Sequence, residues 1–172
     1  MGSQVSVTIE NVPATLRMLK KIDPDLRKKV PEQIKSYAQP LLNDAKSSLP
    51  TTAPLSGWNR SRFRWRAGTV RNGVRLQFKG TRPRNSPANS WAVLRLRSTT
   101  APGAVYDIAG RKSSGRTQTG QIMIRELNSR HGRASRSIWP AVEKHADEIE
   151  KGIEKIFDDY AQIINKELAK WQ

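Results

Sequence analysis

Histidine is the side chain best suited to acid–base and metal chemistry near neutral pH, and this sequence has two, His131 and His145, which are 14 residues apart. No cysteine accompanies them, which excludes disulfides and thiolate metal ligands. His145 falls on the polar side of a predicted C-terminal helix, where we expect it to face solvent. Two separated histidines without further ligands predict no metal site.

Only two carboxylates, Asp107 and Glu126, lie between residues 50 and 138. Both are expected to pair with the surrounding arginines, and nothing marks them as a general acid and a general base. The pair Ser113-Ser114 follows Arg111-Lys112, but the glycine spacing of a phosphate-binding P-loop is missing. We therefore predict no catalytic residues, no cofactor and no enzymatic activity; a small basic enzyme or toxin is the least supported alternative.

Arginine dominates the chemistry of the sequence. The net charge is +16, and residues 50–138 hold eighteen Lys/Arg against two Asp/Glu, whereas residues 1–49 have a balance of +3 and residues 139–172 a balance of −3. Such a block is expected to face phosphate, an acidic protein surface, or both, with a solvated basic face as the simpler alternative. The candidates for contact with DNA or a partner are Arg60, Arg62, Arg64, Arg66, Arg71, Arg75, Arg82, Arg84, Arg111, Lys112 and Arg116.

Aromatic residues are interleaved with this arginine block. From Phe63 to Ala67 apolar residues alternate with arginines, which predicts a strand with an apolar and a cationic face. Asn72-Gly73 then predicts a hairpin turn into a strand that continues through Phe78. One alternative is a sequence-independent nucleic-acid-binding protein that stacks bases on Trp58, Phe63, Trp65 and Trp91. The shared face of Phe63 and Trp65 favours burial in a core instead.

The elements before residue 50 are expected to be a strand and a long helix. Val5, Val7 and Ile9 alternate with polar residues and predict the strand. One or two helical turns are expected over residues 16–22. Asp23-Pro24 then predicts the start of a helix that ends before Pro50 and is kinked or split at its internal prolines, Pro31 and Pro40.

Four further elements are expected after the hairpin. A strand is predicted at Trp91–Leu96, a short strand at Gly103–Tyr106, a mobile loop at Gly110–Gly120 and a short helix at Ile122–Leu127.

The last element is a C-terminal helix of about 32 residues, roughly 48 Å long, with Ser137 as its N-cap and Pro140 in its first turn. This length exceeds what a small domain needs, so we expect part of it to pack on another subunit. The proposed oligomer seam consists of Ile149, Ile153, Ile156, Tyr160 and Ile163.

Together these patterns predict an α+β fold. Its antiparallel sheet is expected to carry a long kinked N-terminal helix and a long C-terminal helix packed on it. We expect a single domain over residues 1–172, with a strand and helix in 1–49, a basic β-rich region with a mobile loop (110–120) in 50–136, and the C-terminal helix in 137–172. No apolar run approaches the roughly 20 residues of a membrane span, and no signal peptide is recognisable, so the cytoplasm of the producing cell is the expected location.

The order of these parts resembles a known family. Asp44-Ala45-Lys46-Ser47-Ser48-Leu49-Pro50 ends the first helix, and Ser56-Gly57-Trp58 follows. Ala104-Val105-Tyr106-Asp107-Ile108-Ala109-Gly110 comes next, and Ser137-Ile138-Trp139-Pro140-Ala141-Val142 opens the last helix. This order resembles the neck or tail-completion proteins of long-tailed bacteriophages, the group that includes the lambda minor tail protein Z.

The resemblance implies a structural protein of the virion, present in the host cytoplasm during assembly. It would form a homo-oligomeric ring at the head–tail junction, around the DNA channel, that matches a twelve-fold portal region to a six-fold tail. Its partners would be the connector or stopper protein and the tail terminator. Many relatives differ at the residues after Asp107 and around Trp139-Pro140, which leaves the position within the neck open.

Overall fold

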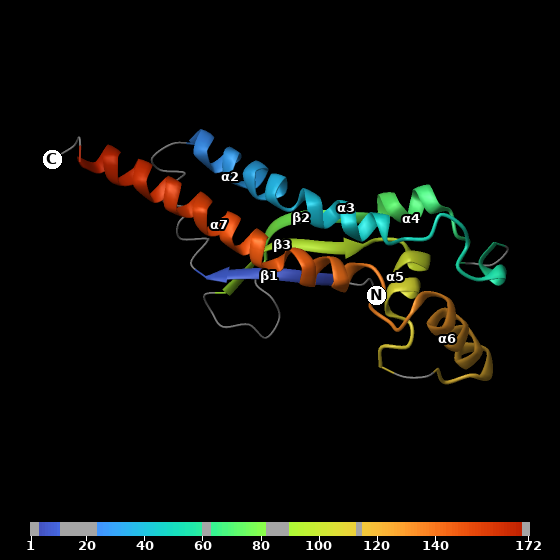
Figure 1. Ribbon diagram of the computed structural model, residues 1–172. Coiled ribbons are helices and arrows are strands. Elements are labelled where there is room, and N and C mark those ends of the chain that lie inside the picture. The colour runs from blue at the N-terminus through green and yellow to red at the C-terminus, as the bar shows by residue number, and fades with distance from the viewer. Residues whose placement is uncertain (1–3, 11–23, 60–62, 82–89, 113–114, 170–172) are drawn as a thin grey trace. The chain divides into compact units, whose positions relative to one another are not determined.

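The computed structural model describes residues 4–10, 24–59, 63–81, 90–112 and 115–169. The fold is α+β and mostly helical (Figure 1). Its elements are β1 (Gln4–Glu10), α2 (Pro24–Tyr37), α3 (Gln39–Ser47), the 3-10 turn η1 (Ser56–Asn59), α4 (Ala67–Gly73), β2 (Val74–Thr81), β3 (Ser90–Ser98), α5 (Ala101–Ile108), α6 (Gln118–His131) and α7 (Ile138–Ala169).

The three strands form one sheet in the order β1-β3-β2, with β2 and β3 antiparallel. The strands predicted around Val5 and from Trp91 to Leu96 are confirmed as β1 and β3. Leu94 and Leu96 of β3 are buried while Arg97 is exposed. This alternation is what a half-buried strand requires.

The residues group into two compact units that are interleaved along the chain. Unit 1 comprises Met1–Val5, Leu41–Arg75 and Leu96–Lys144, and unit 2 comprises Ser6–Pro40, Leu76–Arg95 and His145–Gln172. Unit 1 therefore holds η1, α4, α5, α6, most of α3 and the first turns of α7. Unit 2 holds α2, the rest of α7 and most of the sheet.

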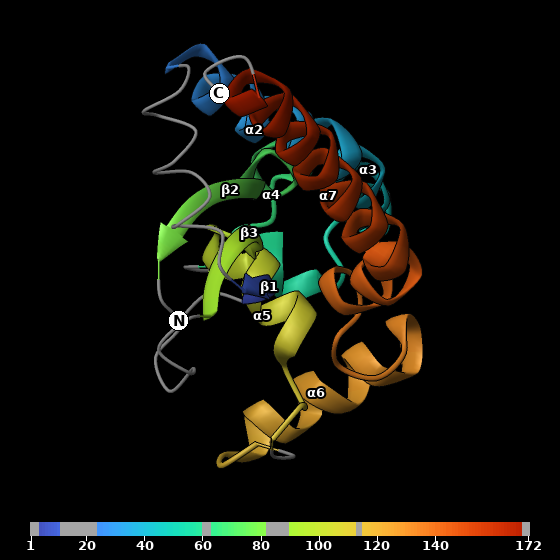
Figure 2. The ribbon, with the colours of Figure 1, turned by 90° about the vertical axis from the view of Figure 1, so that its left-hand side faces the viewer.

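In unit 2, helix α2 lies alongside α7 in the opposite direction (Figure 1 and Figure 2). The Tyr160 hydroxyl donates to Gln33 Oε1 at 3.1 Å, and Gly152, eight residues earlier in α7, faces the ring of Tyr37. A Cβ on Gly152 would lie 2.5 Å from Tyr37 Cδ1, so glycine permits this close approach. Both helices bury one face, with Val30 and Ile34 on α2 and Ile149, Ile153, Ile156 and Tyr160 on α7.

The predicted N-terminal helix is present as two helices. Helix α2 begins at Pro24 as expected and contains Pro31, and the chain leaves the helix at Ala38 before α3 begins at Gln39. The Ala38 N–H still donates to the Ile34 carbonyl at 3.1 Å. Asp23 and the turns expected over residues 16–22 lie outside the described residues.

The predicted strand from Phe63 to Ala67 and the hairpin turn at Asn72-Gly73 are both wrong. Residues 64–66 are irregular, and Ala67–Gly73 form helix α4. Gly73 is buried, and its carbonyl accepts hydrogen bonds from Thr99 N (2.9 Å) and Thr99 Oγ1 (3.0 Å). A Cβ there would lie 2.5 Å from Thr100 Cγ2, so this glycine serves a close contact rather than a turn.

The strand predicted at Gly103–Tyr106 is also wrong, since these residues lie within helix α5. Pro102 stands in the first turn of α5, where a missing N–H costs nothing. A Cβ at Gly103 would meet Ser98 Oγ at 2.8 Å and Val70 Cγ1 at 3.0 Å, which lets α5 pack against α4.

The two helices predicted after residue 120 are both present, and the first of them begins earlier than predicted. Helix α6 starts at Gln118 with Thr117 as its N-cap, so the loop expected over 110–120 ends three residues early and the helix expected at Ile122–Leu127 is longer. Gly132, with φ +79°, ends α6 in a conformation that favours glycine. Helix α7 has 32 residues, begins directly after Ser137 and contains Pro140 in its first turn, as predicted.

Candidate functional site

Asp107 anchors the start of α7 inside unit 1. Its side chain, 2% exposed, accepts three hydrogen bonds at Oδ1, from Ser137 N (2.8 Å), Ser137 Oγ (3.0 Å) and Ile138 N (3.1 Å). A carboxylate at a helix N-terminus is stabilised by the helix dipole and satisfies N–H groups that lack helical partners. Asp107 therefore caps α7 and links α5 to α7, and its charge also acts on the neighbouring Arg136.

Arg136 forms the other half of this junction. Its guanidinium donates five hydrogen bonds, from Nε to Gly132 O, from Nη1 to Tyr106 O and Ala109 O, and from Nη2 to Ala109 O and Asn128 Oδ1. These acceptors lie at the C-terminal ends of α5 and α6, where unpaired carbonyls favour a cation. Burial lowers the pKa of Arg136, and the neighbouring Tyr106 and Asp107 oppose that shift. Arg136 is thus a structural arginine rather than one available to a ligand.

An aromatic row runs through unit 1 beside this junction. Ring centroids are 5.7 Å apart for Trp58 and Trp65, 5.5 Å for Trp65 and Tyr106, and 5.5 Å for Tyr106 and His131. Trp65 Nε1 donates to the Pro50 carbonyl at 3.3 Å. Burial raises the pKa of the Tyr106 hydroxyl.

Two of the four aromatic residues considered for base stacking are part of this core. Trp58 and Trp65 are each 6% exposed, whereas Phe63 is 40% exposed. Phe63 and Trp65 therefore do not share a buried face, contrary to the prediction. The side chain of Trp91 lies outside the described residues.

In the described parts of the chain, neither histidine belongs to a group of three or more His, Cys, Asp or Glu side chains that could hold a metal ion. His131 packs its ring against Tyr106. The prediction that His145 faces solvent is wrong, because its side chain is only 12% exposed. Its Nδ1 lies 3.6 Å from Glu148 Oε2. Both histidines have packing partners that account for their positions.

The basic charge of the chain is concentrated in unit 1. Sixteen Lys/Arg and four Asp/Glu belong to this unit, a balance of +12, whereas unit 2 has fifteen against eleven. All four carboxylates of unit 1 have partners inside it: Asp107 caps α7, Asp44 pairs with Lys144 (2.7 Å), Glu126 pairs with Arg130 (3.2 Å), and Glu143 Oε1 accepts from Trp139 Nε1 (2.6 Å). Too few acids are present to neutralise the arginines.

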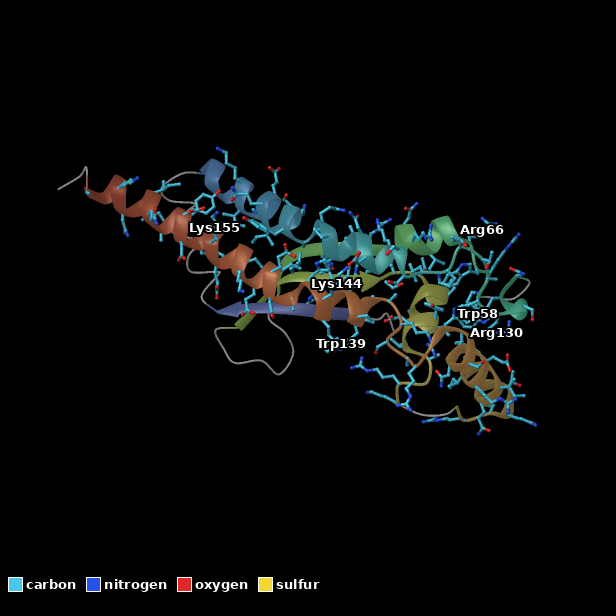
Figure 3. The ribbon with its side chains drawn as sticks, viewed as in Figure 1. Trp58, Arg66, Arg130, Trp139, Lys144 and Lys155 are labelled. Atoms are coloured by element: carbon cyan, nitrogen blue, oxygen red, sulfur yellow. The ribbon has the colours of Figure 1, made fainter. Side chains whose placement is uncertain are left out.

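The arginines proposed as contacts fall into three groups. Arg64, Arg66, Arg111, Lys112 and Arg116 are exposed in unit 1, where Figure 3 marks Arg66 beside α4. Arg71, which is half-buried, donates from Nη2 to Leu49 O (3.1 Å), and Arg75, which is exposed, donates from Nε to Asn72 O (3.0 Å). Arg60, Arg62, Arg82 and Arg84 lie outside the described residues.

Helix α6 adds a groove that the sequence reasoning missed. An open groove of about 950 Å³ follows one face of α6, and its lining combines two arginines, polar side chains and isoleucine: Gln118, Gln121, Ile122, Ile124, Arg125, Asn128, Ser129 and Arg133. Ile122 is 45% exposed there. The i, i+3, i+7 spacing of Ile122, Arg125 and Ser129 is the sequence signal that identifies this face.

The proposed oligomer seam on α7 is corrected by the burial of its residues. Ile149, Ile153, Ile156 and Tyr160 are at most 5% exposed within the chain itself, so they belong to its own core. Ile163, 42% exposed, is the one member that faces solvent. A 3.5-residue apolar period marks a packed seam, but it does not say whether the partner is the same chain.

No protein-family model, curated protein or solved structure matches this chain. Among the helices in the described ranges, none is sufficiently long and apolar to cross a bilayer.

Proposed function

We propose that this protein is a structural protein of a tailed bacteriophage that forms part of the neck ring joining head to tail. In this proposal the ring surrounds the DNA channel, binds the connector or stopper protein and the tail terminator, and carries out no catalysis. The protein is synthesised in the host cytoplasm and ends in the virion.

The observation that carries the proposal is the junction between α5 and α7. Two of the stretches that carry the resemblance, 104–110 and 137–142, are joined by the hydrogen bonds from Ser137 and Ile138 to Asp107. Arg136 adds a bond to the Tyr106 carbonyl within the same pair of stretches. These residues lie 30 apart in sequence but contact one another in the fold. Their contact supports the resemblance more strongly than either stretch does alone.

The charge distribution supports the second part of the proposal. A balance of +12 in unit 1, with its acids engaged internally, suits a surface next to passing DNA, because phosphate attraction needs no base readout. We also propose that the chain bends between α2 and α3 and that α7 packs on the sheet.

The test is disruption of the gene in the phage or prophage that encodes it. We expect DNA-filled heads and complete tails that remain separate in electron micrographs, because the joint between them is missing. Addition of the purified protein to such a lysate should join them and restore infectivity. Normal particles from the disrupted gene, or intact virions that lack the protein, would contradict the proposal.

A sequence-independent nucleic-acid-binding protein is the second candidate, favoured by the same unneutralised arginines. Burial of Trp58 and Trp65 removes two of its proposed stacking platforms. What remains of this candidate is attraction of the backbone phosphates.

A further inference from the structure

The groove along α6 has the composition of a docking surface. It offers the guanidinium groups of Arg125 and Arg133 together with the apolar side chains of Ile122 and Ile124. Glu126, the acidic residue of α6, lies outside the lining and pairs with Arg130. The described residues that line the groove come from α6 and the segment directly after it. An occupant should therefore be acidic, with an apolar or aromatic side chain for the isoleucines.

Helix α7 presents a ridge of that chemistry. At 100° per residue, the side chains of Trp139, Glu143, Asp147, Glu150, Glu154 and Asp158 fall within a stripe about 100° wide, and all six are exposed. Trp139 is 43% exposed, and its indole is held along the helix by the bond from Nε1 to Glu143 Oε1. Figure 3 shows Trp139 at the beginning of α7.

The groove is long enough for most of the ridge. Helix α6 spans about 21 Å over its 14 residues. The whole ridge from Trp139 to Asp158 covers 20 residues, or about 30 Å, and its part from Trp139 to Glu154 is about 24 Å long. Tryptophan is the residue type most enriched at the energetic centres of protein interfaces, and charge complementarity around it sets orientation and suppresses wrong partners.

We propose that the α7 ridge of one copy of this chain docks in the α6 groove of a second copy. The contact is heterologous, because each copy presents a ridge to one neighbour and a groove to the other, and repetition of such a contact closes a ring if its rotation permits. The contact follows from the two surfaces; that it closes the neck ring rests on the proposed function. Trp139 would contact Ile122, while Arg125 and Arg133 pair with acids of the ridge.

Charge reversal in the full-length protein tests this contact. Arg125→Glu with Arg133→Glu reverses the groove, and Glu150→Lys with Glu154→Lys reverses the ridge. In sedimentation velocity at low ionic strength, each double variant should self-associate at least about tenfold more weakly than wild type. An equimolar mixture of the two should restore association, because each reversed surface then meets its complement in the other variant.

Matched controls carry the same change of charge elsewhere. Arg64→Glu with Arg66→Glu alters exposed arginines of unit 1 outside the groove, and Glu148→Lys with Asp159→Lys alters acids of α7 off the ridge. Both controls should associate as wild type does. Equal weakening in controls and test variants, or a mixture that does not recover, overturns the proposal.

A cross-link identifies the occupant directly and detects weak association. p-Benzoylphenylalanine at position 122, mixed with isotope-labelled wild type, should cross-link to peptides from residues 138–158 of the labelled copy. Absence of an intermolecular product, or a product elsewhere in the chain, overturns the proposal. If the groove variant loses affinity for duplex DNA while its self-association is unchanged, the groove is a phosphate site and the proposal fails.

The outcomes also separate this contact from the proposed function. Gene disruption that yields unjoined heads and tails, combined with charge-reversal variants that still assemble, would reject the contact and leave the neck function standing. Self-association through ridge and groove in a phage whose particles do not need the protein would reject the neck function alone.

Discussion

Substitution of Asp107 by alanine should be among the most destabilising single changes in unit 1. The change leaves the N–H groups of Ser137 and Ile138 without the acceptor that they share in a buried site. An orphaned buried donor costs about 1–3 kcal/mol, and the Ser137 hydroxyl, released from Oδ1, can offset part of this by capping α7 itself. We expect a net loss of about 3 kcal/mol in the free energy of unfolding.

Asp107→Asn is the matched control, because the amide keeps an oxygen at the position of Oδ1 but removes the charge. The interaction of that charge with the dipole of α7 contributes about 1 kcal/mol, so the loss should be about a third as large. Urea unfolding followed by circular dichroism measures both variants, and the dependence on denaturant should not change. If Asp107→Ala unfolds within about 0.5 kcal/mol of wild type, as an unremarkable surface substitution does, the capping role is wrong.

Three further predictions follow from other sites. Gly152→Ala should destabilise the protein by about 1–3 kcal/mol through overpacking against Tyr37, whereas Gly68→Ala, in a helix with open space around it, should be neutral or gain up to about 1 kcal/mol; thermal unfolding of both variants checks the pair. Burial raises the pKa of Tyr106 and of Tyr160. Above about pH 10 the unfolded chain therefore loses protons that the folded chain keeps, and the free energy of unfolding should fall with rising pH. Tyr106→Phe should make this fall less steep in urea titrations at several pH values, and an unchanged slope would count against the role of Tyr106. Duplex DNA should bind without sequence preference, with the logarithm of affinity falling by about 0.9 per phosphate neutralised for each tenfold rise in salt; one preferred sequence that is bound tightly at high salt would be inconsistent with this.

The sequence predicted the elements whose pattern has a single physical cause. The period of α7 and the start of α7 after Ser137 are examples, because an apolar stripe at helical spacing along a 32-residue helix has no strand equivalent. Burial of Ile149 and Ile153 against the chain itself was not predictable in the same way, since periodicity identifies the packed face but not its partner.

Two of the mispredicted elements depend on glycines with two possible roles. Asn72-Gly73 fits a hairpin turn, but Gly73 is required where Thr100 approaches the backbone, and Gly103 is required where α5 approaches Val70. Sequence alone does not distinguish a glycine needed for its dihedral angles from one needed for its small size. The role of Asp107 was hidden for a similar reason, because its partners at Ser137 and Ile138 are backbone and side-chain donors 30 residues away.

The aromatic row of unit 1 has an optical consequence. Trp58 and Trp65, with ring centroids 5.7 Å apart and tilted by 40°, are sufficiently close for their indole transitions to couple and produce a paired band in circular dichroism. Tyr106, next in the row, should transfer its excitation energy to Trp65 and emit little light of its own. The paired band and the energy transfer are both lost when η1, Trp65 and α5 separate. The far-ultraviolet circular dichroism, in contrast, also reports the helical structure of α2 and of the distal turns of α7. Comparing the two during unfolding would reveal whether unit 1 and unit 2 lose their structure together.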